Sequence, residues 1–200
     1  MFRKVCVFLI RAFLNVYFKI DVVNVDRFEK LKSGCVITPN HIAMWETLIV
    51  PSNSKRVMYM MAKEELFKNK FVNWLLIHLK AFPIGRGKSD IGAIKKSVDI
   101  LKKGNAICMF PQGTRAKSAD KLKFKTGAAM IAHTAKVPVV PVGIYAEDNY
   151  KFRSRVTVVY GEPIYFYDYY DKKLSKEELN KLTAILEEAV SKEINKAKER

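Results

Sequence analysis

The chain has 200 residues, of which 49% are hydrophobic, and its formal net charge is +16. This length suits one domain with a substantial core and excludes two domains of ordinary size, while the positive charge favours nucleic acid, anionic lipid headgroups or phosphorylated small molecules as partners. Three cysteines without CxxC or zinc-type spacing argue against a disulfide framework or a structural metal site and favour a reducing, cytoplasmic environment.

The first twenty residues predict an amphipathic helix. The apolar run before Arg11 has only six residues, whereas a simple membrane span needs roughly 20. Polar residues gather on one side of a helical wheel, opposite a broad apolar face: Lys4, Arg11, Asn15 and Lys19. We therefore expect a membrane-interface helix over residues 1–22, ahead of a domain over residues 23–200. The alternatives are a helix packed on the protein's own core and a signal peptide, although Arg11 splits the apolar region that a signal peptide needs.

Downstream of residue 22, short apolar runs alternate with amphipathic ones, which favours an α/β fold. Strands are predicted at residues 35–38, 56–61, 82–84, 106–110, 137–144 and 155–160. Helices are predicted after His41 and at residues 71–80, 90–103 and 126–135. We expect a single α/β domain with a mixed central sheet flanked by helices.

Two prolines interrupt the strand predicted at residues 137–144. Pro138 and Pro141 lack an amide donor, so this segment is expected to be an edge strand, to contain a bulge, or to break.

The C-terminal segment predicts a long amphipathic helix. Ser175 and Glu178 have capping-box spacing. The apolar residues that follow share one helical face: Leu179, Leu182, Ile185, Leu186, Ala189, Val190 and Ile194. The opposite face, rich in lysine and glutamate, is expected to be solvated.

The string NHIAMWET, residues 40–47, places His41 at a strand-to-helix turn. A helix N-terminus there would keep the imidazole neutral, and a carboxylate partner, for which Glu46 is the candidate, would fix its tautomer. Side chains five apart on a helix point about 140° apart, so the two meet only if His41 lies just outside the helix and folds back. The alternative is a polar turn residue followed by a solvent-facing glutamate.

The string FPQGTR, residues 110–115, follows a predicted strand and so lies at a strand's carboxyl end, where α/β proteins commonly bind ligands. Gly113 permits close backbone approach, Thr114 offers a hydroxyl, and Arg115 offers a bidentate fork for an anion. This pattern predicts a phosphate site; the alternative is a purely structural turn.

With these strings in order, the chain resembles the glycerolipid acyltransferase family, which contains lysophosphatidic acid acyltransferase, from about residue 36 to 163. NHIAMWE resembles the first motif, NHxSxxD, and FPQGTR resembles the third, FPEGTR. AFPIGRG, with Arg86, resembles the second motif, and VPVVPVGI at residues 137–144 resembles the fourth, a valine-proline stretch. Residues 61–68 and 124–132 also look like the family.

The resemblance implies transfer of a fatty acyl group from coenzyme A or acyl carrier protein to the free hydroxyl of a lysophospholipid, with lysophosphatidic acid the leading acceptor. His41 would take the hydroxyl proton and Glu46 would orient the imidazole, without an acyl-enzyme. The substrate-binding residues implied are Asn40, Arg86, Gln112, Gly113, Thr114, Arg115 and Lys125. The thioester would be a co-substrate, with no cofactor or metal, and the enzyme would lie on an anionic membrane surface at the cytoplasmic face, as a monotopic or peripheral protein.

The motifs depart from the family in four places. Glu46 replaces an aspartate and adds a methylene, and Gln112 replaces a glutamate and removes a negative charge. Ala43 and Gly85 replace a serine and an aspartate without removing a proton-transfer group. We therefore expect a working enzyme.

Other reactive residues are expected to be structural. His78 and His133 have no acid at a suitable spacing, and Cys35, in a buried strand, would be a poor thiolate. Trp45 and Trp74 are expected to pack, with lipid contact as the alternative.

The alternative functions are acylation of another lysolipid and a basic, non-catalytic protein that binds nucleic acid or a membrane. Basic clusters and the aromatic residues within 165–170 could contact a nucleic acid, but no nucleic-acid motif accompanies them, so no nucleic acid is expected as a partner.

Overall fold

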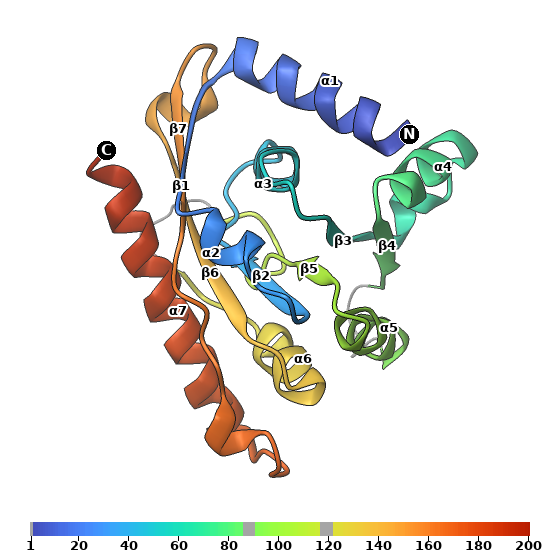
Figure 1. Ribbon diagram of the computed structural model, residues 1–200, viewed down its shortest axis with the longest axis vertical. Coiled ribbons are helices and arrows are strands. Elements are labelled where there is room, and N and C mark those ends of the chain that lie inside the picture. Colours follow the sequence, from blue (N-terminus) through green and yellow to red (C-terminus); the bar gives the residue numbers. More distant parts are fainter. Residues whose placement is uncertain (1, 86–90, 117–121) are drawn as a thin grey trace.

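Seven strands form one mixed sheet in a computed structural model that describes residues 2–85, 91–116 and 122–200 (Figure 1). The strands are β1 (Lys19–Val23), β2 (Cys35–Pro39), β3 (Met58–Lys63), β4 (Ala81–Ile84), β5 (Ala106–Cys108), β6 (Val139–Ala146) and β7 (Arg155–Tyr160). Their spatial order is β1-β7-β6-β2-β5-β3-β4. The β6–β7 pair is antiparallel, and the other pairs among these strands are parallel.

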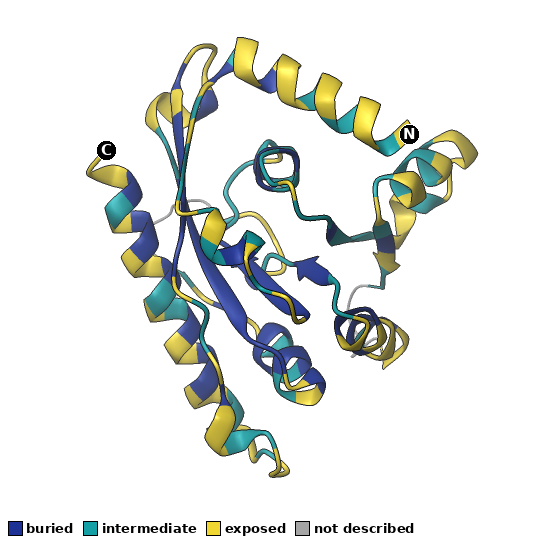
Figure 2. Cartoon of the chain, viewed as in Figure 1, coloured by how far each residue is buried: buried dark blue, intermediate teal, exposed yellow. Residues whose placement is uncertain are grey.

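Helices cover both faces of the sheet. They are α1 (Phe2–Tyr17), α2 (Asp26–Glu29), α3 (Glu46–Ser52), α4 (Lys70–His78), α5 (Ile91–Lys102), α6 (Gly127–Ala135) and α7 (Lys176–Lys198). Side chains of β2 alternate between two cores, because Val36 packs with α5, α6 and α7, whereas Cys35 and Ile37 pack with α1, α2 and α3. Strands β2, β5, β6 and β7, in the middle of the sheet, are largely buried (Figure 2). The expected α/β fold with a mixed sheet flanked by helices is confirmed.

The parallel arrangement places the carboxyl ends of β2, β3, β4, β5 and β6 at one edge of the sheet. The segment after β2, which contains His41, therefore meets the segment after β5, which contains Gly113. This edge is where ligands bind in open α/β sheets.

Each of the six predicted strands is present, with ends within two residues of the prediction, whereas β1 was not predicted. Helix α1 ends at Tyr17 and Lys19–Val23 pairs with β7, so the prediction of helix through residue 22 is wrong. The strand forms because β7, more than 130 residues later, offers its edge, and local periodicity does not report that partner.

Strand β6 lies inside the sheet, between β7 and β2, so the edge position considered for it is wrong. Pro138 lies just before the strand, and its carbonyl accepts from Val36 N at 3.0 Å. Pro141 lies one residue beyond the last β6–β7 pair, Val142 with Tyr160, and its carbonyl still accepts from Gly161 N at 2.8 Å. The missing amide therefore removes one hydrogen bond where the ladder with β7 already ends.

Helix α7 begins with the predicted capping box: Ser175 Oγ accepts from Glu178 N at 3.1 Å, and a Glu178 carboxylate oxygen accepts from Ser175 N at 2.8 Å. The helix packs directly on β6, since a Cβ at Gly143 would lie 2.2 Å from the carbonyl carbon of Glu193.

The apolar surface of α1 is divided into two stripes. Ile10, Leu14 and Tyr17 pack on the core beside α3. A second stripe at helical spacing is exposed: Phe2, Val5, Leu9, Phe13 and Val16. Core packing therefore accounts for one stripe and leaves the other facing outward (Figure 2). In the part of the chain that is described, no helix combines the length and apolar character needed to cross a membrane.

Candidate active site

The turn between β2 and α3 is fixed to the neighbouring strand by Asn40. Its side-chain Nδ2 donates to Ile144 O at 2.9 Å, and its Oδ1 accepts from Ile144 N at 2.7 Å. The Asn40 side chain is fully buried. The prediction that it binds substrate is not supported by this geometry, because both of its polar groups are already used to hold the turn on β6.

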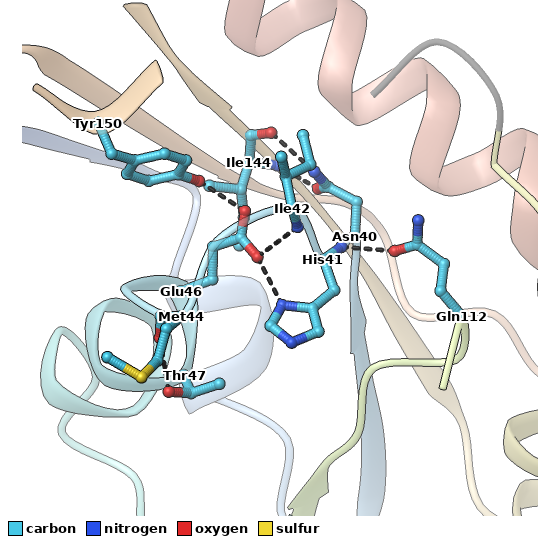
Figure 3. Close-up of polar contacts among 9 residues, drawn as sticks. All are labelled: Asn40, His41, Ile42, Met44, Glu46, Thr47, Gln112, Ile144 and Tyr150. Atoms are coloured by element: carbon cyan, nitrogen blue, oxygen red, sulfur yellow. Dashed lines mark hydrogen bonds and ion pairs between the residues drawn. The ribbon is translucent and has the colours of Figure 1, made fainter. Parts of the chain in front are cut away.

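His41 and Glu46 form the predicted pair (Figure 3). Glu46 is the first residue of α3, and His41 lies outside the helix and folds back, so that Nδ1 is 2.7 Å from Glu46 Oε2. The carboxylate is fully buried, whereas the imidazole side chain is 14% exposed. The geometric requirement set by the five-residue spacing is therefore met.

The hydrogen bonds of the Glu46 carboxylate set the tautomer of His41. Oε2 also accepts from Ile42 N at 2.8 Å, and Oε1 accepts from the Tyr150 hydroxyl at 2.6 Å. Burial, together with the adjacent carboxylate, raises the pKa of Tyr150, so this hydroxyl keeps its proton. Because both Glu46 oxygens already accept from other donors, the oxygen that faces His41 acts as an acceptor, so the neutral imidazole carries its proton on Nδ1 and leaves Nε2 as a proton acceptor.

The segment after β5 holds the main chain and the ring of His41. Gln112 Oε1 accepts from His41 N, and Ala116 N donates to His41 O at 2.8 Å. The Phe110 ring stacks on the imidazole with a centroid distance of 4.1 Å and an angle of 30°. The two motifs are therefore one structure, in which Gln112 is largely buried and serves as an acceptor for the backbone of the proposed base.

The glycine turn itself is open to solvent. Gly113 has φ of +73°, a conformation that favours glycine, and its amide donates to Phe110 O at 3.0 Å. Thr114, Arg115 and Lys125 are exposed, and a Cβ at Gly113 would lie 3.0 Å from the Lys125 side chain. An open hollow of about 320 Å³ adjoins the turn and is lined by Gln112, Thr114, Ala116, Lys123, Phe124 and Lys125. The structure thus brings Gly113, Thr114 and Lys125 together, with Arg115 on the same turn; Arg86 lies outside the described residues.

A sequence profile of the Acyltransferase family matches residues 19–145, which is more than half of the chain. The chain belongs to this family. It is 30% identical to a 1-acyl-sn-glycerol-3-phosphate acyltransferase of Bacillus subtilis, over 96% of this chain and 97% of that one. It is 32% identical to the protein of that name from Streptococcus pneumoniae, over 70% of this chain and 54% of that one. The crystal structure of the LPA acyltransferase PlsC from Thermotoga maritima has a TM-score of 0.75 at 26% identity, covering 99% of this chain and 82% of that one. The resemblance seen in the motifs is confirmed.

Sequence reasoning missed one residue of this acyltransferase site, Tyr150. It lies 104 positions from Glu46, in the 3₁₀ turn Glu147–Tyr150 that follows β6, and no motif contains it. The sequence contains one indirect signal. A carboxylate that is buried beside His41 needs hydrogen-bond donors for both of its oxygens, and His41 can supply a donor to only one of them.

His78, His133 and Cys35 are not part of the His41–Glu46 pair. His78 Nδ1 is 2.7 Å from Trp74 O in its own helix, and His133 Nε2 is 2.7 Å from Tyr169 O. Burial raises the pKa of Cys35 to about 11, so its thiol is protonated at neutral pH, which argues against a cysteine nucleophile. Among the described residues, no group of three or more His, Cys, Asp or Glu could hold a metal ion.

The two tryptophans differ. Trp45 packs as predicted, stacking on Tyr17 at a centroid distance of 5.3 Å. Trp74 is 45% exposed, and its ring packs against Phe2, Phe71 and His78 at the surface.

Proposed function

We propose that this acyltransferase transfers a fatty acyl group from a thioester to the free hydroxyl of lysophosphatidic acid, and so makes phosphatidic acid. The proposal rests on the His41–Glu46 pair, in which Nε2 is the proton acceptor. The backbone amide of His41 donates to Gln112, which links this pair to the glycine turn. Similarity to the Bacillus subtilis protein along nearly the whole chain supports this acceptor.

The chemistry needs one proton acceptor and no covalent enzyme intermediate. His41 Nε2 takes the proton of the acceptor hydroxyl as its oxygen attacks the thioester carbonyl carbon, and Glu46 stabilises the resulting imidazolium. When the tetrahedral intermediate collapses, the C–S bond breaks and the imidazolium returns its proton to the thiolate, which leaves as a free thiol. General-base assistance of this kind contributes about 10²- to 10⁴-fold, and positioning must supply the rest.

The exposed cations of the glycine turn suit the acceptor's phosphate. Arg115 offers a bidentate fork, Lys125 a point charge, and Thr114 a hydroxyl beside the Gly113 backbone. Arg86 remains a predicted further ligand. The acyl donor, coenzyme A or acyl carrier protein, acts as co-substrate, and we propose no cofactor or metal for the reaction.

The exposed stripe of α1 is the proposed membrane contact. It continues onto α4, because the Phe2 ring lies 4.7 Å from that of Trp74, which in turn lies 6.2 Å from that of Phe71 (Figure 1). Exposed basic side chains lie on these two helices and beside them, among them Lys4, Arg11, Lys68 and Lys70. A helix with an exposed apolar stripe and basic side chains on its other side fits an anionic lipid surface, and we assign this contact to the cytoplasmic face.

This surface is connected to the proposed base. Trp45, in the turn between His41 and Glu46, contacts Phe13 and Tyr17 of α1. A lipid acceptor held at the α1 surface would therefore lie near the turn that carries His41.

The membrane contact can be tested with vesicles. Replacing Leu9 and Val16 together by serine should weaken binding to anionic vesicles, with unchanged thermal unfolding, because both side chains are exposed. Leu14→Ala is the matched control, since this buried residue of the same helix should lower stability by about 2–5 kcal/mol. Unchanged vesicle binding by the double variant would contradict the assignment.

The acceptor can be tested by thiol release from a long-chain acyl-CoA in mixed micelles. We expect release to require lysophosphatidic acid and to be much weaker with glycerol 3-phosphate, lysophosphatidylglycerol or a lyso-ornithine lipid. If acyl-CoA gives no release, acyl carrier protein thioesters are tested as donors. Silence with every donor and acceptor, combined with salt-sensitive binding to DNA or RNA, would favour the nucleic-acid alternative.

A further inference from the structure

Tyr150 reaches the proposed catalytic pair from the opposite side to His41. The Glu46 carboxylate divides its contacts, with His41 Nδ1 and Ile42 N on Oε2 and the Tyr150 hydroxyl on Oε1 (Figure 3). Tyr150 is 8% exposed and Glu46 is fully buried. Since water is excluded from the buried carboxylate, Tyr150 is the donor that the described part of the chain offers to Oε1.

The position of Tyr150 is strongly constrained by its surroundings. Asp148, Asn149 and Tyr150 have φ of 50°, 51° and 63°, a left-handed conformation that Asp and Asn adopt more readily than other non-glycine residues and that is unfavourable for the bulky Tyr150. The Tyr150 ring packs edge-on against Phe18, with a centroid distance of 6.0 Å. Strained backbone of this kind persists where the surrounding packing fixes it, and it clusters at functional sites. The turn therefore delivers one hydroxyl to one carboxylate oxygen.

The Tyr150 hydroxyl restricts the orientation of the long Glu46 side chain. Compared with the aspartate of the family's first motif, Glu46 has one more methylene and one more rotatable bond, so its carboxylate can adopt more orientations. A donor on Oε1 removes that freedom and holds Oε2 toward His41 Nδ1.

We propose that Tyr150 is a positioning residue for acyl transfer, which holds the Glu46 carboxylate in place so that it orients the His41 imidazole. The inference rests on the proposed function of His41 and Glu46. Tyr150 acts through Glu46, and its hydroxyl bond is to that carboxylate, away from the proposed phosphate ligands on the glycine turn.

The first test is Tyr150→Phe, which keeps the ring and removes the hydroxyl. We expect kcat to fall roughly tenfold, as the loss of one hydrogen bond to a charged group implies, with unchanged KM for both substrates. Without the hydroxyl, more negative charge stays on the carboxylate and favours the imidazolium, so the acid limb of the kcat/KM profile should move to higher pH. A residue with only a structural part would lower the amount of folded enzyme and leave that limb in place.

The chain supplies a matched control in Tyr160. This tyrosine is fully buried, and its hydroxyl has no hydrogen-bond partner within residues 2–85, 91–116 and 122–200. Tyr160→Phe removes the same atom from a buried ring without touching Glu46. We expect its kcat and its pH profile to match the wild type.

A double-mutant cycle tests whether the hydroxyl acts through the carboxylate. In Glu46→Asp the shorter side chain would not reach both partners, so adding Tyr150→Phe to this variant should cost much less than adding it to the wild type. Equal losses in both backgrounds would overturn the proposal, as would an acid limb that does not move.

Two further measurements keep the inference testable. Replacing Tyr150 by 3-fluorotyrosine keeps a hydroxyl that is a stronger donor, and should move the acid limb to lower pH even if Tyr150→Phe fails to fold. NMR titration of His41 needs no substrate, so it separates this inference from the proposed reaction. A higher His41 pKa in Tyr150→Phe than in the wild type is expected even if lysophosphatidic acid proves not to be the acceptor, and an equal pKa would overturn the inference.

Discussion

The two segments that meet at the carboxyl edge of the sheet are built differently. In the segment after β2, Asn40 and Glu46 are fully buried and their side-chain oxygens accept hydrogen bonds from fixed partners. In the segment after β5, Gly113, Thr114 and Arg115 are exposed beside an open hollow. The segment after β2 is therefore already held by its own hydrogen bonds, whereas the segment after β5 presents charged side chains to solvent.

This difference matches the two tasks of an acyltransferase. Proton transfer needs fixed distances between the base and its partner, which buried hydrogen bonds provide. Capture of an anionic headgroup needs accessible charge, which exposed cations provide. Substitutions in the first segment should therefore lower kcat, and substitutions in the second should raise KM for the acceptor.

The largest expected effect comes from Glu46→Gln. The amide is nearly the same size but cannot stabilise the imidazolium as an anion does, so we expect kcat to fall about 10²- to 10⁴-fold with little change in either KM. Steady-state kinetics in mixed micelles measures this, and thermal unfolding confirms that the variant is folded. A raised acceptor KM with a normal kcat would show that Glu46 serves acceptor binding, and would contradict the assignment of the segment after β2 to proton transfer.

Arg115→Ala should give the next largest effect. Loss of a charge-assisted contact to phosphate should raise the acceptor's apparent KM about 10- to 100-fold and leave the donor's KM nearly unchanged. Arg155→Ala, which removes an exposed arginine from β7, is the matched control and should change neither value. Equal effects of Arg115→Ala on donor and acceptor would contradict its proposed part in phosphate binding.

Gln112 links the two segments, and two variants separate its charge from its hydrogen bond. Gln112→Glu keeps an oxygen that can accept from His41 N, so fold and activity should be retained. Gln112→Leu leaves that amide without its acceptor and should cost about 1–3 kcal/mol of stability together with part of kcat. Denaturant unfolding and kinetics on both variants measure this, and equal behaviour would show that the link to His41 is unimportant.

Gly113→Ala should have the smallest effect. A positive φ disfavours alanine by roughly 1 kcal/mol, and the new Cβ must displace the Lys125 side chain. We expect a rise of a few-fold in acceptor KM with unchanged kcat. Gly104, which also has a positive φ but lies outside this edge, is the control position: Gly104→Ala should alter stability alone.

The parts of the site that sequence could predict are those encoded by neighbouring residues. The spacing of His41 and Glu46 and the turn around Gly113 are local, and the alternation of apolar runs placed both at strand ends. The contacts that could not be predicted join distant segments. Tyr150 meets Glu46 across 104 positions, and Gln112 meets His41 across 71.

The same reasoning explains the errors at the N-terminus. The apolar face of α1 is visible in its sequence, but which stripe packs inward depends on α3 and on Trp45, and this became clear only in the fold. Strand β1 likewise depends on the edge of β7. Asn40 is predicted as a ligand because it stands in a motif, and in the fold its side chain donates one hydrogen bond to Ile144 O of β6 and accepts one from Ile144 N.

The most direct test of the central claim is the formation of phosphatidic acid from lysophosphatidic acid and a long-chain acyl thioester, measured by mass spectrometry for the wild type and His41→Ala at equal concentrations of folded protein. We predict that the wild type makes phosphatidic acid and that the variant is slower by at least about 100-fold, the lower end of general-base catalysis. Equal rates for the two proteins would contradict the assignment of His41 as the base.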